Sequence, residues 1–283
     1  MQEIDEKERE EQELRLQANM DKVIHKIIVM SGKGGVGKTT VAVNLAYALA
    51  QSDKKVGIID TDIHGPNIAK MLGIEKESIG GTEDGRLRPV EVRPNLKAVS
   101  MALVGFDTDR PIVWRGPLKA GVIKQFLADV EWGELDYLVI DSPPGTGDEP
   151  LSVCQLIRKV TGSVIVTTPQ DVAILDSRKA VLFSKELNIP VIGIIENMSG
   201  LICPHCGKEI NVFKKDGGLK ASKELKVPFL GSVPFDTEFV DAGDNGTPFV
   251  AFDNPSRSAQ AFTQIVKKIE DFVNKPKYRD WSR

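Results

Sequence analysis

The sequence is poor in cysteine, in net charge and in long apolar runs. Only three of its 283 residues are cysteines, and 37 basic against 40 acidic residues leave a formal net charge of −3. That balance gives no general attraction to nucleic acid or anionic membranes. With three cysteines and no signal-peptide pattern, we expect no disulfide framework. Because no apolar run approaches the roughly 20 residues that cross a bilayer, we expect a soluble, cytoplasmic protein with neither nucleic acid nor membrane as partner.

The length and the hydrophobic content of the sequence indicate one large domain. A hydrophobic content of 41% is sufficient for a substantial core. Residues 1–24 interleave Glu with Lys and Arg and offer almost no apolar face, which predicts a solvated, frayed helix. We therefore expect a charged N-terminal extension over residues 1–24, one folded domain over 25–275 and a polar tail over 276–283.

Short β-branched runs alternate with helical segments through this domain. The runs predict strands over residues 26–31, 55–60, 136–141, 163–168 and 191–197. Such alternation predicts an α/β fold with a mostly parallel sheet that is flanked by helices on both faces.

Two other segments depart from the alternation. The Gly-, Glu-, Arg- and Pro-rich stretch 74–96 predicts a hairpin around Gly85. Apolar residues at helical spacing over 256–273 favour a surface helix packed on the core over one that binds a membrane.

The strongest motif is GKGGVGKT at residues 32–39, between a predicted strand and the helical pattern TVAVNLAYALAQ. It satisfies the phosphate-loop consensus in the required context. Glycines let successive backbone N–H groups point at phosphates, Lys38 neutralises their charge, and the Thr39 hydroxyl can ligate Mg²⁺. We expect ATP and Mg²⁺ here, with contacts from Gly32, Lys33, Gly34, Gly35, Val36, Gly37, Lys38, Thr39 and Thr40.

Carboxylates end two of the predicted strands, where ligands of α/β proteins bind. Asp60 and Asp62 follow the second strand, and Asp141 ends the strand YLVID. Hydrolysis needs a residue that positions water, and Mg²⁺ needs carboxylates nearby. We assign Asp62 to the water, Asp60 to its support and Asp141 to magnesium; a helix-capping role for Asp60 or Asp62 is the alternative.

The cysteines divide into a pair and a single residue. Cys203 and Cys206 lie in CPHCG, which predicts a metal loop near residues 200–213 within a P-loop ATPase domain over 25–275. Their spacing lets a tight turn aim both sulfurs at one metal. Cys154 lies in a helical pattern and is assigned to the core. The pair supplies half of a four-thiolate site, which a second subunit would complete to hold a [4Fe-4S] cluster. A dimer-bridging Zn²⁺, a redox pair and inert residues are the alternatives, and His205 is a further candidate ligand.

Six motifs occur in an order that resembles one known family. GKGGVGKTT, DTDIHGPN, VWRGP at 113–117, DSPPGTGD, ENMS and CPHCG resemble the Mrp/ApbC iron-sulfur carriers, which are P-loop ATPases of the deviant Walker A type in the MinD/ParA-like superfamily. The resemblance implies that Lys33 is a signature lysine that reaches the nucleotide of a partner subunit, and that Asp62 acts in hydrolysis. It also implies a γ-phosphate sensor in the segment from Asp141 to Gly145, through Pro143 and Pro144. Residues that would contact adenine are Asn197, Pro234 and Asp236.

The function that this resemblance implies is that of a homodimeric, slowly hydrolysing ATPase. It would hold a [4Fe-4S] cluster at the dimer interface and transfer it to apo iron-sulfur proteins. The second interpretation is a nucleotide-switched positioning or cargo-binding ATPase with structural zinc at that interface.

Overall fold

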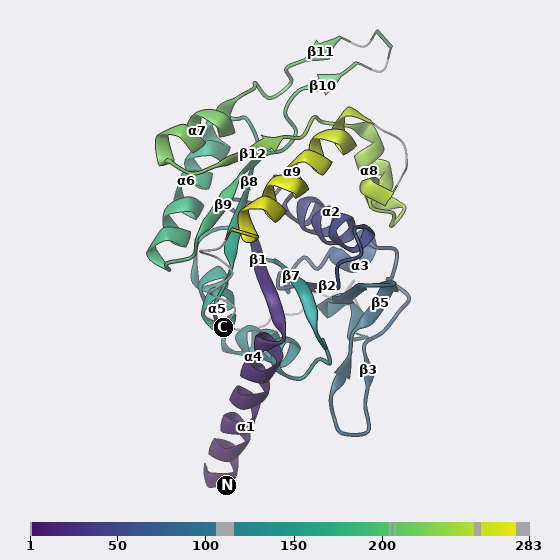
Figure 1. The fold of residues 1–283 in the computed structure, drawn as a ribbon, viewed down its shortest axis with the longest axis vertical. Coiled ribbons are helices and arrows are strands. Elements are labelled where there is room, and N and C mark those ends of the chain that lie inside the picture. Colours follow the sequence, from purple (N-terminus) through teal and green to yellow (C-terminus); the bar gives the residue numbers. More distant parts are fainter. Residues whose placement is uncertain (1, 106–115, 204, 207, 252–255, 276–283) are drawn as a thin grey trace.

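The computed structural model describes residues 2–105, 116–203, 205–206, 208–251 and 256–275. The described residues form a central eight-stranded sheet with helices on both of its faces (Figure 1). Its strand order is β12-β9-β8-β1-β7-β2-β6-β5, and every neighbouring pair is parallel except β5 with β6. The predicted α/β class is confirmed, as are all five predicted strands.

The strands of this sheet are β1 (Val23–Ser31), β2 (Val56–Asp60), β5 (Val90–Arg93), β6 (Leu96–Val99), β7 (Leu135–Asp141), β8 (Gly162–Thr167), β9 (Val191–Glu196) and β12 (Phe229–Ser232). The α-helices are α1 (Gln2–Asp21), α2 (Lys38–Gln51), α3 (Ile68–Met71), α4 (Gly116–Ala128), α5 (Asp148–Leu156), α6 (Asp171–Glu186), α7 (Gly217–Leu225), α8 (Thr237–Asp244) and α9 (Arg257–Val273). Two short 3₁₀ turns are η1 (Met101–Leu103) and η2 (Phe249–Ala251).

Strand β1 divides the hydrophobic core into two layers. Its side chains alternate, so that Ile27 and Val29 join the cluster under α2 and α9, whereas Ile28 and Met30 join the cluster under α1, α4, α5 and α6. All four are fully buried. A parallel strand that is covered on both faces is apolar along its whole length, which is why the sequence shows continuous β-branched runs here.

Helix α1 corrects one expectation. The helix itself is present, but the predicted solvated character is wrong for its second half, where Leu16 and Met20 are 1% and 2% exposed. The amide of Asn19 donates to the carbonyl oxygens of Leu127, Ala128 and Val130 at 3.1, 2.8 and 2.9 Å. Leu127 and Ala128 lie in the last turn of α4, where carbonyl groups lack a helical partner, and Val130 follows the helix. Leu16 and Met20 are the side chains of this charged segment that join the core, and together with Asn19 they dock it.

Two further expectations are confirmed. A hairpin of β3 (Gly80–Gly81) and β4 (Leu87–Arg88) surrounds Gly85, whose positive φ of 79° suits glycine. The apolar face of α9 packs on the core, with Phe262, Ile265 and Ile269 at most 1% exposed. Among the helices of the described residues, none combines the length and the apolar composition that a bilayer crossing requires.

Replacing Asn19 by Ala is expected to lower the free energy of unfolding by about 1–3 kcal/mol, because buried carbonyl groups lose their donor. Urea denaturation measures the change. Gln17→Ala is the matched control on the exposed side of α1, and its expected effect is small. Equal losses in both variants would show that the α1–α4 contact does not depend on the Asn19 amide.

Candidate nucleotide and metal sites

The phosphate loop follows β1 directly and leads into α2. Gly37 precedes the helix with φ 81°, a left-handed conformation that glycine adopts without strain. A Cβ atom on Gly32 would lie 2.1 Å from the carbonyl group of Asp176 in α6, so no side chain fits there. The two glycines therefore fix both the curl of the loop and its approach to α6.

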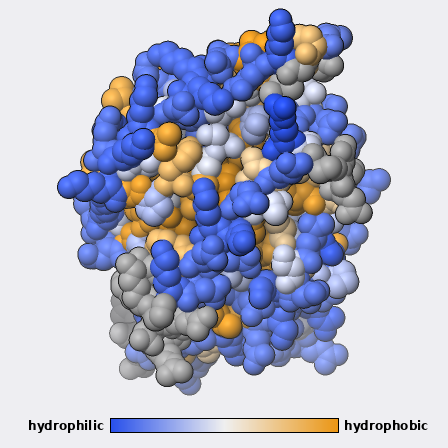
Figure 2. All heavy atoms as spheres, turned by 45° about the horizontal axis from the view of Figure 1, so that its top comes forward, coloured by the Kyte–Doolittle hydropathy of each residue, from blue (hydrophilic) through white to orange (hydrophobic). Residues whose placement is uncertain are grey.

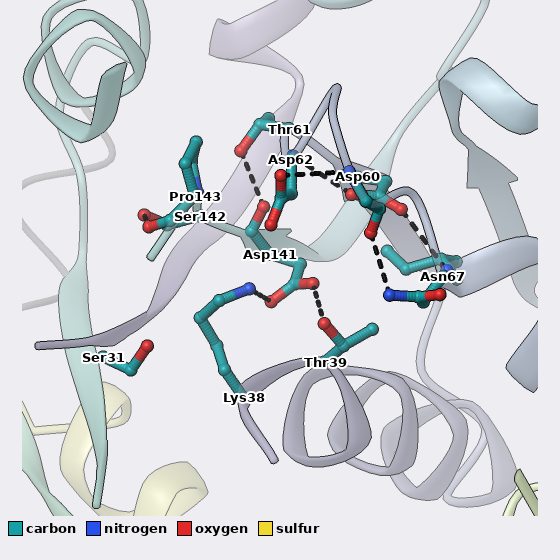
Figure 3. A network of polar contacts seen from close by, with 12 residues as sticks. Ser31, Lys38, Thr39, Asp60, Thr61, Asp62, Asn67, Asp141, Ser142 and Pro143 are labelled. Atoms are coloured by element: carbon teal, nitrogen blue, oxygen red, sulfur yellow. Dashed lines mark hydrogen bonds and ion pairs between the residues drawn. The ribbon is translucent and has the colours of Figure 1, made fainter. Parts of the chain in front are cut away.

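At the start of α2, Lys38 and Thr39 both contact Asp141 (Figure 3). The Lys38 ammonium lies 2.6 Å from Oδ1 of Asp141, and the Thr39 hydroxyl donates to Oδ2 at 2.6 Å. The Lys38 and Asp141 side chains are 7% and 1% exposed. Burial raises the pKa of Asp141, and the Lys38 charge opposes that shift. One carboxylate thus holds both of the groups that are expected to meet phosphate and Mg²⁺.

Asp60 lies beside Asp141, because β2 and β7 pair in register at these two residues. Burial, reinforced by the negative charge of Asp141, raises the pKa of Asp60 to about 8. Its carboxylate accepts hydrogen bonds from the backbone N–H groups of Asp62 and Ile68, at 3.1 and 3.3 Å, and from the Ser100 hydroxyl at 3.3 Å. These bonds fit the supporting role expected of Asp60.

A cavity of about 420 Å³ opens beside the phosphate loop. Of the residues predicted to act there, those that line it are Lys33, Gly34, Gly35, Gly37, Lys38, Thr39, Thr40, Asp62 and Pro144. Among the described residues, none pairs with the Lys33 ammonium group. Gly32 packs on α6 instead, and the Val36 side chain is buried in the core. The structure therefore gathers most of the predicted nucleotide residues around one space.

The three predicted adenine residues do not line this cavity. The Asn197 amide donates to the carbonyl oxygen of Val36 in the phosphate loop at 2.9 Å. Asp236 caps α8 by accepting from the backbone N–H of Glu238 at 3.1 Å, and Pro234 precedes it. Their contact with a base stays a prediction.

Sequence reasoning missed a different set of cavity residues, which come from two short helices. They are Asn67, Lys70 and Met71 at α3, with Phe239, Val240, Gly243 and Asp244 in α8. The only sequence signals were that Asn67 ends the motif DTDIHGPN and that the other residues follow this motif or VPFD closely.

Lys119 of α4 was also missed. It is 8% exposed, and its ammonium group contacts both Nε2 of His64, in the segment after β2, and the carboxylate of Glu149 in α5. One buried lysine thus joins the segments that follow Asp62 and Asp141. Within the VWRGP motif, residues 113–115 lie outside the described chain.

The oxygen donors at the loop fit a magnesium ion. Mg²⁺ prefers hard oxygen ligands and takes one or two carboxylates together with phosphate oxygens. Thr39 lines the cavity, and its hydroxyl donates to the Asp141 carboxylate, which is buried behind it. When bound, the ion would supply positive charge that neutralises phosphate.

The cysteine pair lies in a small hairpin of β10 (Leu201–Ile202) and β11 (Glu209–Ile210), which projects at the top of Figure 1. The backbone N–H of Cys203 donates to the carbonyl of Lys208 at 2.9 Å. The backbone N–H groups of Cys206 and His205 donate hydrogen bonds that lower the pKa of Cys203, and the bond from Cys206 has the larger effect. Cys203 is half-buried, whereas Cys206 and His205 are exposed. Backbone donors that favour a thiolate suit a metal-binding turn.

Cys154 is separate from this pair, in α5. It is partly buried against the core, as expected, and burial raises the pKa of its thiol to about 12. In the part of the chain that the structure describes, no group of three or more His, Cys, Asp or Glu side chains is arranged to hold a metal. The hairpin therefore presents two thiols and an incomplete ligand set.

The sheet order, the phosphate loop and the two strand-end carboxylates together define a P-loop NTPase of the MinD-like class. A family description, the NUBPL iron-transfer P-loop NTPases of the ParA group, matches residues 22–270. The chain belongs to this family, which confirms the resemblance drawn from its motifs.

Two curated relatives and two solved structures locate the chain within the class. It is 49% identical to an iron-sulfur cluster carrier protein of Methanocaldococcus jannaschii, over 93% of this chain and 90% of the relative. It is 44% identical to an iron-sulfur cluster carrier protein of Saccharolobus solfataricus, over 92% and 88%. A nucleotide-binding protein from Archaeoglobus fulgidus, solved in complex with ADP, superposes with a TM-score of 0.73 at 38% identity, over 83% and 91%. The cell division ATPase MinD of Pyrococcus furiosus shares the fold, with TM-score 0.61 at 23% identity over 88% and 99%.

Replacing Lys38 by Met is expected to abolish ATP binding and to lower the free energy of unfolding of the nucleotide-free protein by about 3–5 kcal/mol, since Asp141 loses its buried counter-charge. Urea denaturation and calorimetric titration with ATP measure the two effects. Lys33→Met is the control, because Lys33 has no ion-pair partner in the described chain. A stability loss as large for Lys33→Met would contradict the importance of the buried pair.

Proposed function

We propose that the protein is an ATP-hydrolysing carrier of a [4Fe-4S] cluster, which two identical chains hold between them and deliver to apo iron-sulfur proteins. The cluster is cargo in this scheme, and ATP with Mg²⁺ occupies the cavity beside the phosphate loop. The names of the relatives, as iron-sulfur cluster carrier proteins, support the cargo. The ADP in the Archaeoglobus fulgidus protein supports the nucleotide.

The observation that carries the proposal is the cysteine hairpin. It presents two thiols, of which Cys203 receives backbone hydrogen bonds that favour its thiolate form. A [4Fe-4S] cluster takes four thiolates, and Cys154 lies apart in α5 with a raised thiol pKa. Two chains related by a two-fold axis would supply the four.

Two features near the phosphate loop support a dimer. Lys33 lines the cavity and keeps its ammonium group free of partners in the described chain, as a lysine that reaches a second subunit would. Val172 and Leu175 of α6 are 64% and 60% exposed, within a turn or so of Asp176, which packs on Gly32. Figure 2 views the molecule with the top of Figure 1 turned forward, and apolar side chains gather in the middle of this face. Exposed apolar patches of this kind mark interaction surfaces.

The proposed hydrolysis assigns the attacking water to Asp62. This residue is half-buried and lines the cavity, where it accepts from the backbone N–H of Gly65 at 3.3 Å. A carboxylate with lone pairs left over after one weak bond can orient a water molecule. If Asp62 only shaped its loop, the variant Asp62→Asn would hydrolyse ATP at an unchanged rate.

Anaerobic reconstitution with iron and sulfide tests the cargo. The wild type is expected to become brown, to hold about two iron atoms per chain, as one shared four-iron cluster requires, and to migrate as a dimer. Cys203→Ala and Cys206→Ala are each expected to lose the iron, whereas the matched control Cys154→Ala keeps it. Metal analysis, visible absorption and native mass spectrometry measure these outcomes.

Two results would contradict this scheme. An iron-loaded protein that is strictly monomeric would exclude the shared site. A colourless protein that retains stoichiometric zinc after anaerobic purification would favour the switch that positions a cargo, with zinc as a structural ion.

Asp62→Asn is expected to slow ATP hydrolysis by about 10²-fold or more, the usual size of proton-transfer assistance, while ATP affinity changes little. The asparagine oxygen can still accept from Gly65, so the loop contact survives. Single-turnover phosphate release measures the rate. Asp244→Asn is the control, because it removes another carboxylate from the cavity wall. An unchanged rate in Asp62→Asn would reduce Asp62 to a structural residue of its loop.

A further inference from the structure

The end of β9 contacts both sites through two consecutive residues. Asn197 donates through its side-chain amide to the carbonyl of Val36 in the phosphate loop at 2.9 Å, and through its backbone N–H to Thr167 at 2.7 Å. Its neighbour Glu196 contacts the base of the cysteine hairpin. Two adjacent residues thus connect the end of β9 to the phosphate loop and to the base of the cysteine hairpin.

The Glu196 carboxylate holds both ends of the segment that carries the cysteines. On the entering side, the Ser199 hydroxyl donates to Oε1 at 2.6 Å. On the returning side, the backbone N–H of Asp216 donates to Oε1 at 3.1 Å and that of Gly218 donates to Oε2 at 2.6 Å. The residues between these two sides include the β10–β11 hairpin with Cys203. One side chain therefore holds together the two ends of residues 199–218, which we call the excursion.

This clamp has little freedom to rearrange. Glu196 is fully buried, and a buried carboxylate is costly unless several donors satisfy it. A Cβ atom on Gly218 would lie 3.1 Å from the Cβ of Glu196, so the backbone of α7 packs directly on this side chain. Moving one end of the excursion away from the other would leave the carboxylate short of donors.

The contact on the nucleotide side is equally close. A Cβ atom on Gly37 would lie 2.2 Å from Nδ2 of Asn197, so the amide fills the space beside the phosphate loop. Asn197 is 7% exposed. A change in the curl of the loop at Val36 and Gly37 must therefore move Asn197 or break its hydrogen bond.

We propose that Glu196 is a positioning residue that couples the phosphate loop to the cysteine hairpin. Rearrangement of the loop around phosphates shifts Asn197 at the end of β9, and Glu196 passes this shift to both ends of the excursion that carries Cys203 and Cys206. The use of this coupling, cluster release under control of the nucleotide, rests on the proposed function. The coupling itself is a property of one chain and needs no cluster.

Thiol alkylation tests the coupling in the metal-free, reduced, full-length protein. Iodoacetamide modification of Cys203 and Cys206 is followed by peptide mass spectrometry, with and without saturating Mg²⁺ and a non-hydrolysable ATP analogue. In the wild type the nucleotide is expected to change the alkylation rate by about fivefold or more, the lower range of coupling between sites. The rates are measured over a range of protein concentrations, because shielding by a second chain varies with concentration and coupling within one chain does not.

Glu196→Gln carries the main prediction. An amide has one acceptor oxygen and presents an NH₂ group to the backbone donors, so the alkylation rate should become independent of nucleotide while calorimetry still detects nucleotide binding. Ser199→Ala removes only the entering bond, and an intermediate nucleotide effect is expected. If Glu196→Gln does not fold, the nucleotide effect on alkylation in Ser199→Ala tests the coupling instead. The matched control is Glu209→Gln, whose carboxylate pairs with Lys215 inside the excursion at 2.6 Å and should keep the full effect.

Three outcomes would overturn the clamp. They are a full nucleotide effect in both Glu196→Gln and Ser199→Ala, no effect in the nucleotide-bound wild type at any concentration, and an effect that follows protein concentration alike in the wild type and both variants. Failure of the proposed function is recognised separately, since a wild type that cannot assemble a cluster still reports its thiol rates.

Discussion

The nucleotide site depends on how the chain keeps the carboxylate of Asp141 satisfied at the end of β7. Burial alone would drive it to its neutral form, and the Lys38 ammonium with the Thr39 hydroxyl supplies the opposing interactions. These same groups are the ones that a P-loop offers to phosphates and to magnesium. In the proposed function, phosphate and Mg²⁺ would take over Lys38 and Thr39, and the Mg²⁺ charge would then oppose the burial of Asp141.

Sheet register places a second carboxyl group at the same point. Asp60 on β2 stands opposite Asp141 on β7, and the raised pKa of Asp60 reflects both its burial and that neighbour. A positive charge placed between two neighbouring carboxyl groups stabilises their ionised forms, so this pair makes a site that favours cations. The site's preference for Lys38, and for magnesium in the proposed function, thus follows from which residues the parallel strands bring side by side.

The sequence was sufficient for the parts of the fold that are periodic or local. Continuous apolar runs predict buried parallel strands, and the P-loop motif carries its own backbone geometry, so β1, α2 and the positions of Lys38 and Thr39 followed directly. Asp141 was recognised because it ends such a run. The CPHCG hairpin was equally local. Each of these features is determined by residues within about one element of each other.

The features that sequence reasoning missed depend on contacts across the chain. Asn19 satisfies carbonyls more than a hundred residues away, so the composition of residues 1–24 could not reveal that α1 docks on α4. Phe239 and Val240 look like ordinary helix residues until α8 is placed over the phosphate loop. Lys119 gains its role only when α4 lies between the segments of His64 and Glu149.

The two residues at the end of β9 illustrate the same limit and lead to a thermodynamic consequence. The family resemblance implies that Asn197 contacts adenine, yet in the structure its amide donates to Val36 in the phosphate loop. No sequence signature marks the neighbouring Glu196 as buried. If these residues couple the two loops as proposed, the coupling must be reciprocal, because binding free energies form a closed cycle. Whatever factor the nucleotide imposes on metal binding at Cys203 and Cys206, the metal imposes on nucleotide affinity. The cargo would then regulate the ATP site as much as ATP regulates the cargo.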